Sequence, residues 1–156
     1  MTGYWSVVEP YWDGCPTDDP TAFLSYYASM PQVARNLLTT HWVVSEVCNG
    51  GFHQLVTNPT GVLLPEAIVG FRAIQLDELA RIASEACSFF GQAYPREQLS
   101  RIEALKRFGA LSKPDGWNPF EKADNRFYAA LDLEEDRDAY TSSADIYANS
   151  VRNGAS

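Results

Sequence analysis

The chain has 156 residues, of which 46% are hydrophobic, a share that supports a folded core and excludes a wholly disordered acidic chain. Its 12 Lys and Arg residues against 20 Asp and Glu residues give a formal net charge of −8. Such a charge disfavours nucleic acids and anionic membranes as partners and favours basic ones. This length suits one domain, so we expect residues 1–156 to form a single acidic domain.

The N-terminus lacks a basic start followed by an apolar run, and the longest apolar stretches are too short to span a bilayer. The cysteines, Cys15, Cys48 and Cys87, are odd in number and widely spaced, with no Cys-x-x-Cys pair. We therefore expect no disulfide framework and a cytoplasmic location. For Cys48 and Cys87 we expect buried positions as small apolar side chains.

The first elements in chain order are two short helices. Residues 4–12 are rich in aromatic side chains and predict a short helix, with Pro10 either at its end or at the start of a new turn. Asp19 and Pro20 are typical of an N-cap and first helical position, so a second helix should follow. The aromatic side chains of the first segment can either complete the core or form an apolar interface: Tyr4, Trp5, Tyr11 and Trp12.

A longer helix comes next. Ser29 is a candidate cap with Pro31 in the first turn, and apolar residues recur at three- and four-residue spacing as far as Cys48. Gly50 and Gly51 should end this helix, because glycine adopts left-handed backbone angles without a steric penalty.

The second half of the chain predicts further helices between turn signals. Asn58-Pro59 and Gly61 mark a turn, Pro65 opens a helix, and a further helix starts at Pro95 and stops at Gly109. The apolar spacing predicts helices over residues 65–74, 76–90, 95–108, 120–131 and 134–151. Alternation of apolar and polar residues is scarce, so we expect an all-α, compact bundle of seven or eight helices with at most a trivial sheet.

The run Thr39-Thr40-His41-Trp42-Val43-Val44-Ser45-Glu46-Val47-Cys48-Asn49-Gly50-Gly51-Phe52-His53-Gln54 is the most distinctive part of the chain. The glycines permit a chain reversal, after which Phe52 can re-enter the core, and Asn49 or Gln54 can satisfy the freed backbone groups. We therefore favour a structural role for Asn49, Gly50, Gly51 and Phe52. A ligand or partner contact at Asn49, His53 or Gln54 is the alternative.

This run resembles the Asn-Gly-Gly-Phe signature of a bacterial family named for DNA mimic protein nineteen. The similarity continues through the turn at 58–61, the Pro65 helix, the helix end at 89–91 and the segment 125–128, and so covers about residues 31–149. The resemblance implies an all-helical homodimer. For the founding member it also implies an acidic surface that imitates duplex DNA and occupies the DNA-binding face of a transcription regulator.

Two acidic regions are candidates for such a surface. The first precedes Arg35, the first base in the chain, and the second lies between Asp115 and Asp145, where acids outnumber bases; the middle helices are nearly balanced. On a helix, Glu134, Asp138 and Asp145 would form a negative row on one face. Alternatively, the acids of this region have only a structural role, because anions are favoured near a helix N-terminus. The candidate partner-binding residues are Glu9, Asp13, Asp18, Asp19, Asp132, Glu134, Glu135, Asp136, Asp138 and Asp145.

A catalytic site or a metal site has less support in the sequence than a binding surface has. The acids from Asp132 to Asp138 are spaced like a calcium loop, but Arg137 stands where that loop needs glycine. A hydrolase or transferase would need Cys48 paired with His41 or His53, and no basic neighbours activate that thiol. We therefore expect no catalytic residue, no metal and no cofactor.

The sequence thus predicts a non-enzymatic inhibitor that mimics duplex DNA and binds a basic DNA-binding protein, without binding nucleic acid or membranes itself. An immunity protein that neutralises a basic nuclease toxin is the first alternative. A small hydrolase that uses cysteine and histidine is the second.

Overall fold

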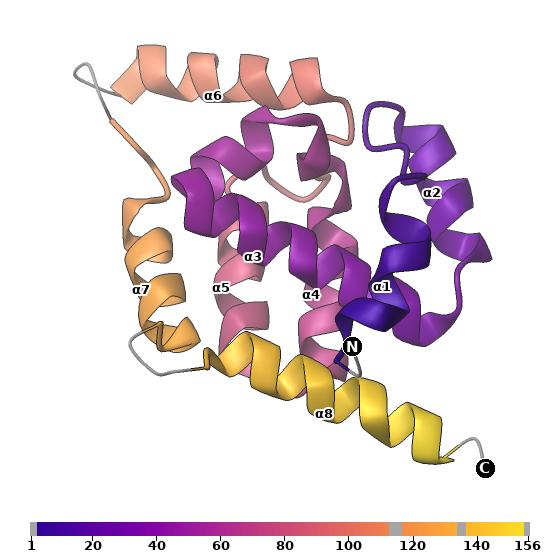
Figure 1. Ribbon diagram of the computed structural model, residues 1–156. Coiled ribbons are helices and arrows are strands. Elements are labelled where there is room, and N and C mark those ends of the chain that lie inside the picture. The colour runs from indigo at the N-terminus through magenta and orange to yellow at the C-terminus, as the bar shows by residue number, and fades with distance from the viewer. Residues whose placement is uncertain (1–2, 113–116, 134–136, 155–156) are drawn as a thin grey trace.

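The computed structural model describes residues 3–112, 117–133 and 137–154. Within these ranges it contains eight α-helices, one short 3-10 helix and no strand (Figure 1). The elements in chain order are α1 (Trp5–Trp12), α2 (Pro20–Ser29), α3 (Gln32–Thr57), η1 (Pro59–Leu63), α4 (Leu64–Ala73), α5 (Asp77–Ser88), α6 (Gln98–Ser112), α7 (Glu121–Leu131) and α8 (Ala139–Gly154). The predicted all-α bundle is confirmed. No helix in the described ranges has the length and apolar content needed to cross a bilayer.

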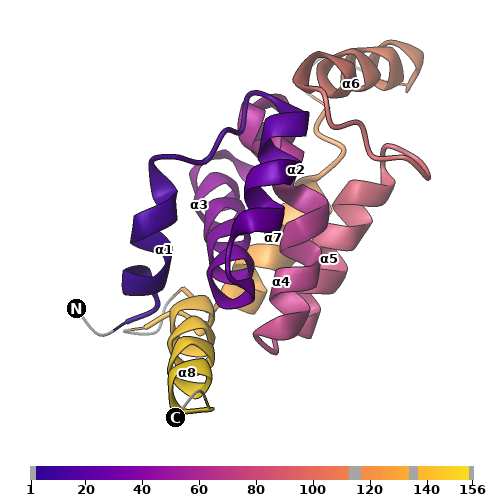
Figure 2. The same cartoon turned by 90° about the vertical axis from the view of Figure 1, so that its right-hand side faces the viewer.

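Helix α3 is the centre of the bundle. It contacts α1, α4, η1, α6, α7 and α8, while α5 packs between α4 and α7. Figures 1 and 2 show α6 along one end of the molecule and α8 along the opposite end. The ring of Phe127 on α7 packs edge-on against Phe52 of α3, with 5.3 Å between ring centroids, and against Phe71 of α4 at 6.0 Å. All three rings are fully buried, so helices distant in sequence share one core.

The N-terminal aromatic side chains complete this core. Tyr4, Trp5, Tyr11 and Trp12 are partly buried and pack against it. Trp12 stacks on Trp42 of α3 with 4.1 Å between centroids and 11° between ring planes. Helix α1 lies beside α3 in both views (Figures 1 and 2).

Some predicted helix ends are right and others are wrong. Asp19 caps α2 as expected, accepting hydrogen bonds from the backbone N–H groups of Thr21 at 3.0 Å and Ala22 at 3.2 Å. Ser29 caps nothing, because it is the last residue of α2 and its hydroxyl donates to the carbonyl of Tyr26. Helix α3 begins directly after Pro31.

The later boundaries move for physical reasons. Helix α6 begins at Gln98 rather than Pro95, since the backbone carbonyls of Pro95 and Arg96 are held by the side chain of Arg101. It also continues through Gly109, where a methyl group would meet no neighbour within 4 Å. Helix α8 begins at Ala139, and not at residue 134.

A buried arginine attaches α6 to the bundle. Arg101 is 0% exposed and donates to the carbonyl oxygens of Val56 at 2.8 Å and Asn58 at 2.9 Å, at the C-terminal end of α3. The same guanidinium donates to the carbonyls of Pro95 and Arg96. Carbonyls at a helix C-terminus carry partial negative charge, so they suit a cation that has no carboxylate partner.

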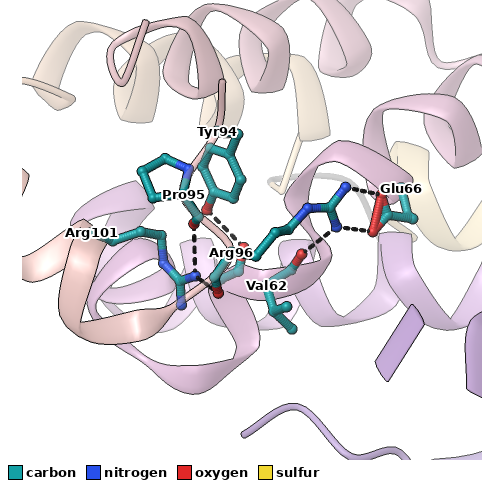
Figure 3. Close-up of polar contacts among 7 residues, drawn as sticks. Val62, Glu66, Tyr94, Pro95, Arg96 and Arg101 are labelled. Atoms are coloured by element: carbon teal, nitrogen blue, oxygen red, sulfur yellow. Dashed lines mark hydrogen bonds and ion pairs between the residues drawn. The ribbon is translucent and has the colours of Figure 1, made fainter. Parts of the chain in front are cut away.

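The segment before α6 adds two further ties. Tyr94 donates its hydroxyl to the carbonyl of Gly61 at 2.7 Å. Arg96 pairs with both carboxylate oxygens of Glu66 on α4 and also donates to the carbonyl of Val62 at 2.9 Å (Figure 3). The connection between α5 and α6 is therefore held against η1 and the start of α4.

Candidate protein-binding surface and the glycine break

The acids of the α1–α2 region lie on the protein surface. Glu9, Asp13, Asp18 and Asp19 are all exposed, and none of them forms an ion pair with a described residue. The first base after them, Arg35, lies over the ring of Tyr27 at 5.1 Å. We call these four carboxylates the α1–α2 acidic face. Asp19 also caps α2, and its carboxylate stays exposed while one of its oxygens accepts from the backbone.

The predicted acids around α8 have partners within the protein. Asp138 precedes α8 and caps it, accepting from the backbone N–H of Thr141 at 2.8 Å and from its hydroxyl at 2.9 Å. Asp145 forms an ion pair with Arg137 and accepts the backbone N–H of Tyr4 at 2.7 Å, which joins α8 to α1. The predicted negative row is therefore replaced, at these two positions, by a cap and a tie between helices.

The other predicted acids of this region lie between α7 and α8 in the sequence. Asp132 is exposed and ends α7 with a left-handed backbone φ of 53°. Glu134, Glu135 and Asp136 lie outside the described residues.

Three acids of the middle helices, Glu66, Glu78 and Glu85, form ion pairs with bases. Glu78 pairs with Arg81 and Arg126, and Glu85 pairs with Arg126 at 2.5 Å. This pattern agrees with the nearly balanced charge of that part of the sequence. Asp77, Glu97, Glu103 and Glu121 are also exposed without an ion pair to a described residue, so the acids of α1 and α2 differ from them in that no base precedes Arg35 in the sequence.

The Asn-Gly-Gly-Phe signature interrupts α3. Gly50 has φ −156° and ψ 20°, and Gly51 has φ 76° and ψ −179°, so neither residue is helical. The angles of Gly51 lie in a region that only glycine occupies readily. A Cβ atom there would also lie 2.5 Å from the Oδ2 atom of Asp124. Two separate constraints therefore require glycine at position 51.

Helix α7 supplies the hydrogen bonds that this break removes from α3. After the break, the backbone N–H of Phe52 donates to the Oδ1 atom of Asp124 at 2.8 Å. Before the break, the carbonyl of Val47 accepts from the hydroxyl of Tyr128 at 2.7 Å. Asp124 and Tyr128 lie one turn apart on α7, so one helix face satisfies both freed groups. Burial raises the pKa of Asp124.

Asn49 and Gln54, which we expected to satisfy the freed backbone groups, are placed differently in the structure. Asn49 is exposed, and Gln54 donates its side-chain amide to the carboxylate of Glu46 at 2.8 Å. Glu46 is buried and also accepts from Asn58 at 3.1 Å and Thr60 at 2.8 Å. This carboxylate ties the first part of α3 to the segment after the break.

We expect the Asp124→Ala substitution to lower the free energy of unfolding by about 2 kcal/mol, because it leaves the buried N–H of Phe52 without an acceptor. Urea unfolding followed by far-UV circular dichroism measures this loss. The matched control is Asp124→Asn, which keeps a carbonyl oxygen in reach of the same N–H and should lose less than half as much. Equal losses for the two variants would show that the hydrogen bond contributes nothing.

The cysteine and histidine side chains do not assemble a catalytic pair. Cys48 is exposed, contrary to the buried position we expected. Desolvation of its sulfur and the nearby charge of Asp138 raise its pKa, which keeps the thiol protonated. The Nδ1 atom of His41 is hydrogen-bonded to the hydroxyl of Tyr4 at 2.9 Å, and neither His41 nor His53 is hydrogen-bonded to Cys48.

The described residues also bring together no group of three or more histidine, cysteine, aspartate or glutamate side chains suited to a metal ion.

A groove of about 390 Å³ lies between the end of α4 and helix α8. It is lined by Ala73, Ile74, Gln75, Ser143, Ile146, Tyr147 and Ser150. None of these lining residues is charged.

These features define an all-α protein with an acidic face at its N-terminal helices and a glycine break in its central helix. The chain belongs to the DMP19-like protein family, whose model matches residues 28–148. This range includes α3 through α7, most of α8 and both sides of the glycine break, whereas Glu9 to Asp19 precede it. The family takes its name from a DNA mimic protein. No curated protein and no solved structure matches the chain.

Proposed function

We propose that this protein binds a basic DNA-binding protein, most simply a transcription regulator, and inhibits it by occupying the surface that otherwise holds DNA. The observation that carries the proposal is the α1–α2 acidic face, whose carboxylates are exposed and form no ion pair with a described residue. A DNA mimic needs such carboxylates, because an acid already neutralised by arginine cannot replace a phosphate.

The charges favour fast capture of a basic partner. Oppositely charged surfaces steer their own encounter, and salt screens that attraction over about 8 to 10 Å. Asp132 and Asp138 can extend the face, since neither forms an ion pair with a described residue, and Glu134, Glu135 and Asp136 remain predicted members of it. Asp145 contributes least, because Arg137 compensates its charge.

The family membership supports the remaining parts of the proposal. We infer a homodimer in the cytoplasm, with residues 1–156 as one domain and with no catalytic activity. The raised pKa of Cys48 and the absence of a hydrogen bond between it and either histidine support a binding role over the hydrolase alternative.

The test compares two variants of equal charge. One replaces the exposed acids of the proposed face that cap no helix N-terminus, Glu9→Gln, Asp13→Asn and Asp18→Asn. The other replaces three exposed acids elsewhere, Glu97→Gln, Glu103→Gln and Glu121→Gln. We expect the first triple variant to capture a DNA-binding protein from the native lysate about tenfold more weakly at low salt, because each exposed charge contributes up to about 1 kcal/mol.

The charge-matched control should keep most of the wild-type affinity and most of its salt dependence. Equal weakening by both variants would mean that net charge alone, and not the α1–α2 acidic face, governs capture. Wild-type affinity of the first variant would contradict the proposed face. Recovery of a nuclease toxin in place of a regulator would support the immunity-protein alternative.

A further inference from the structure

His41 lies where three helices meet. It belongs to α3, and its ring is enclosed by rings of α1 and α8. The centroid distances are 5.1 Å to Trp5 and 5.2 Å to Trp12 on α1, 5.8 Å to Tyr4 just before α1, and 6.5 Å to Tyr140 on α8. The imidazole is therefore the centre of the aromatic cluster through which α1 docks.

The polar contacts of this cluster are few. The Nδ1 atom of His41 is hydrogen-bonded to the hydroxyl of Tyr4 at 2.9 Å. The indole N–H of Trp42, next to His41 in sequence, is buried without a hydrogen-bond partner in the described structure. The cluster is thus poorly equipped to receive a charge, because a buried cation needs compensating partners.

Two carboxylates near the cluster, those of Asp138 and Asp145, interact with its tyrosines. Asp145 accepts the backbone N–H of Tyr4 and is compensated by Arg137. Asp138 caps α8, and its charge helps to raise the pKa values of Tyr4 and Tyr140. The rings that contact His41 are those of Tyr4, Trp5 and Trp12, before and on α1, and of Tyr140 on α8. No carboxylate of the residues that the structure describes forms an ion pair with His41.

Helix α1 depends on the packing of its side chains against α3, which includes the stacking of Trp12 on Trp42. Val8 is its one fully buried side chain, and the helix has eight residues, too short to be stable without packing. Its hydrogen bonds to other elements include the Tyr4 bond to Asp145, a half-buried bond from the hydroxyl of Tyr26 to the carbonyl of Tyr11, and an exposed bond from Arg152 to the hydroxyl of Ser6.

We propose that His41 makes the docking of α1 dependent on pH, so that protonation of its ring releases α1 from α3 and α8. Burial lowers the pKa of the docked imidazole below its ordinary value of 6.5, whereas a solvated ring in the undocked state regains that value. The proton therefore binds more tightly to the undocked state. Docking is complete above the ordinary pKa and weakens as the pH falls below it, by up to about tenfold for each pH unit until the docked ring itself is protonated.

Release of α1 would move Glu9 and Asp13 relative to the rest of the protein. Acidic conditions would then weaken partner capture as well as the packing of α1, and this consequence rests on the proposed function. The docking of α1 itself can be measured without any partner.

The experiment uses the two histidines of the chain as probe and internal control, in protein prepared without a histidine tag. Proton NMR of the imidazole C2 protons between pH 5 and 8 gives a separate midpoint for half-buried His41 and for exposed His53. We expect a lower midpoint for His41. The amide signals of residues 5–12 and the tryptophan fluorescence should change with that midpoint, because three of the four tryptophans, Trp5, Trp12 and Trp42, lie in the cluster.

The His41→Gln variant stays neutral at every pH and keeps a polar atom for Tyr4, so its α1 signals should no longer respond to pH. The His53→Gln variant should respond as wild type does. A His41 midpoint at or above that of His53 would show that the surrounding rings stabilise the imidazolium and would overturn the proposal. So would a lower midpoint with unchanged α1 signals. The His41 midpoint and the α1 signals are both measured on the wild-type protein, so the test holds even if the His41→Gln variant fails to fold.

The same readings separate this proposal from the proposed function. Failure of the acidic face appears as full partner capture by the triple variant at pH 7.5, where α1 is docked. If His41 does not control the docking of α1, the NMR titration shows it without any partner present.

Discussion

The Gly51→Ala substitution should lower the free energy of unfolding by about 3 kcal/mol or more. The first contribution is backbone strain, since φ 76° with ψ −179° costs a residue with a side chain about 1 to 3 kcal/mol. The second is a collision, because the new Cβ atom would lie 2.5 Å from the Oδ2 atom and 2.9 Å from the Cγ atom of Asp124. Asp124 must then move away and release the N–H of Phe52, which adds about 1 to 3 kcal/mol.

Two other glycines separate these contributions. Gly91 has φ 89°, but a Cβ atom there would meet nothing within 4 Å, so Gly91→Ala measures strain alone. Gly109 lies within α6 with no neighbour within 4 Å, so Gly109→Ala should be neutral or stabilising by up to about 1 kcal/mol. Urea unfolding of the three variants is the measurement. A loss for Gly51→Ala no larger than that for Gly91→Ala would contradict the role given to Asp124.

The Arg101→Ala substitution should cost about 3 to 5 kcal/mol of unfolding free energy. It removes a fully buried side chain and leaves a cavity between α6 and α3. It also removes the donors to four backbone carbonyls, those of Val56, Asn58, Pro95 and Arg96. Each buried acceptor left without a donor adds to the loss.

Two controls accompany this variant. Arg101→Lys keeps the charge but cannot present the planar fork of donors, so it should recover only part of the loss. Arg96→Ala removes a neighbouring side chain that is 31% exposed and should cost less than Arg101→Ala, since solvent can replace part of its pairing with Glu66. Thermal unfolding by calorimetry ranks the three variants. An Arg101→Ala protein as stable as Arg96→Ala would show that the carbonyl contacts are not needed.

The helices were predictable from the sequence where local signals agree. Apolar residues at helical spacing and turn residues between them predicted the order of the elements, and Asp19 with Pro20 marked the start of α2. Gly50 and Gly51 marked the break in α3, because glycine pairs permit non-helical angles.

The boundaries that failed depend on contacts between distant residues. Pro95 is a good local start for a helix, but the backbone there is held by Arg101 from within the next helix. Ser29 is a good local cap, but its hydroxyl donates backwards to Tyr26 within α2. A local pattern cannot distinguish these outcomes.

The residues that support the glycine break were missed for the same reason, although a signal was present. Asp124 is an acid on the apolar stripe of α7, between Phe120 and Phe127, and a buried acid needs a donor to face it. Glu46 is likewise flanked by Val43 and Val47 on the buried side of α3. An acid at an apolar position therefore indicates a tie to another segment, but only the fold identifies that segment.

The acidic face was predictable in part. Charge counting along the sequence located the acids before Arg35, and the structure leaves them exposed. It could not reveal that Asp138 would cap α8 or that Asp145 would bind Arg137 and the backbone of Tyr4. Net charge along a sequence does not distinguish a free carboxylate from one already used within the fold.

The most direct test of the central claim is competition between this protein and DNA for one surface. A DNA-binding protein recovered from the native lysate on the immobilised wild-type chain is purified and bound to a fluorescent duplex that contains its own site. We expect the wild-type chain to displace the duplex stoichiometrically, the triple variant of the α1–α2 acidic face to require about tenfold more protein, and the charge-matched control to behave as wild type. A stable ternary complex, in which the partner holds the duplex and this protein together, would contradict DNA mimicry.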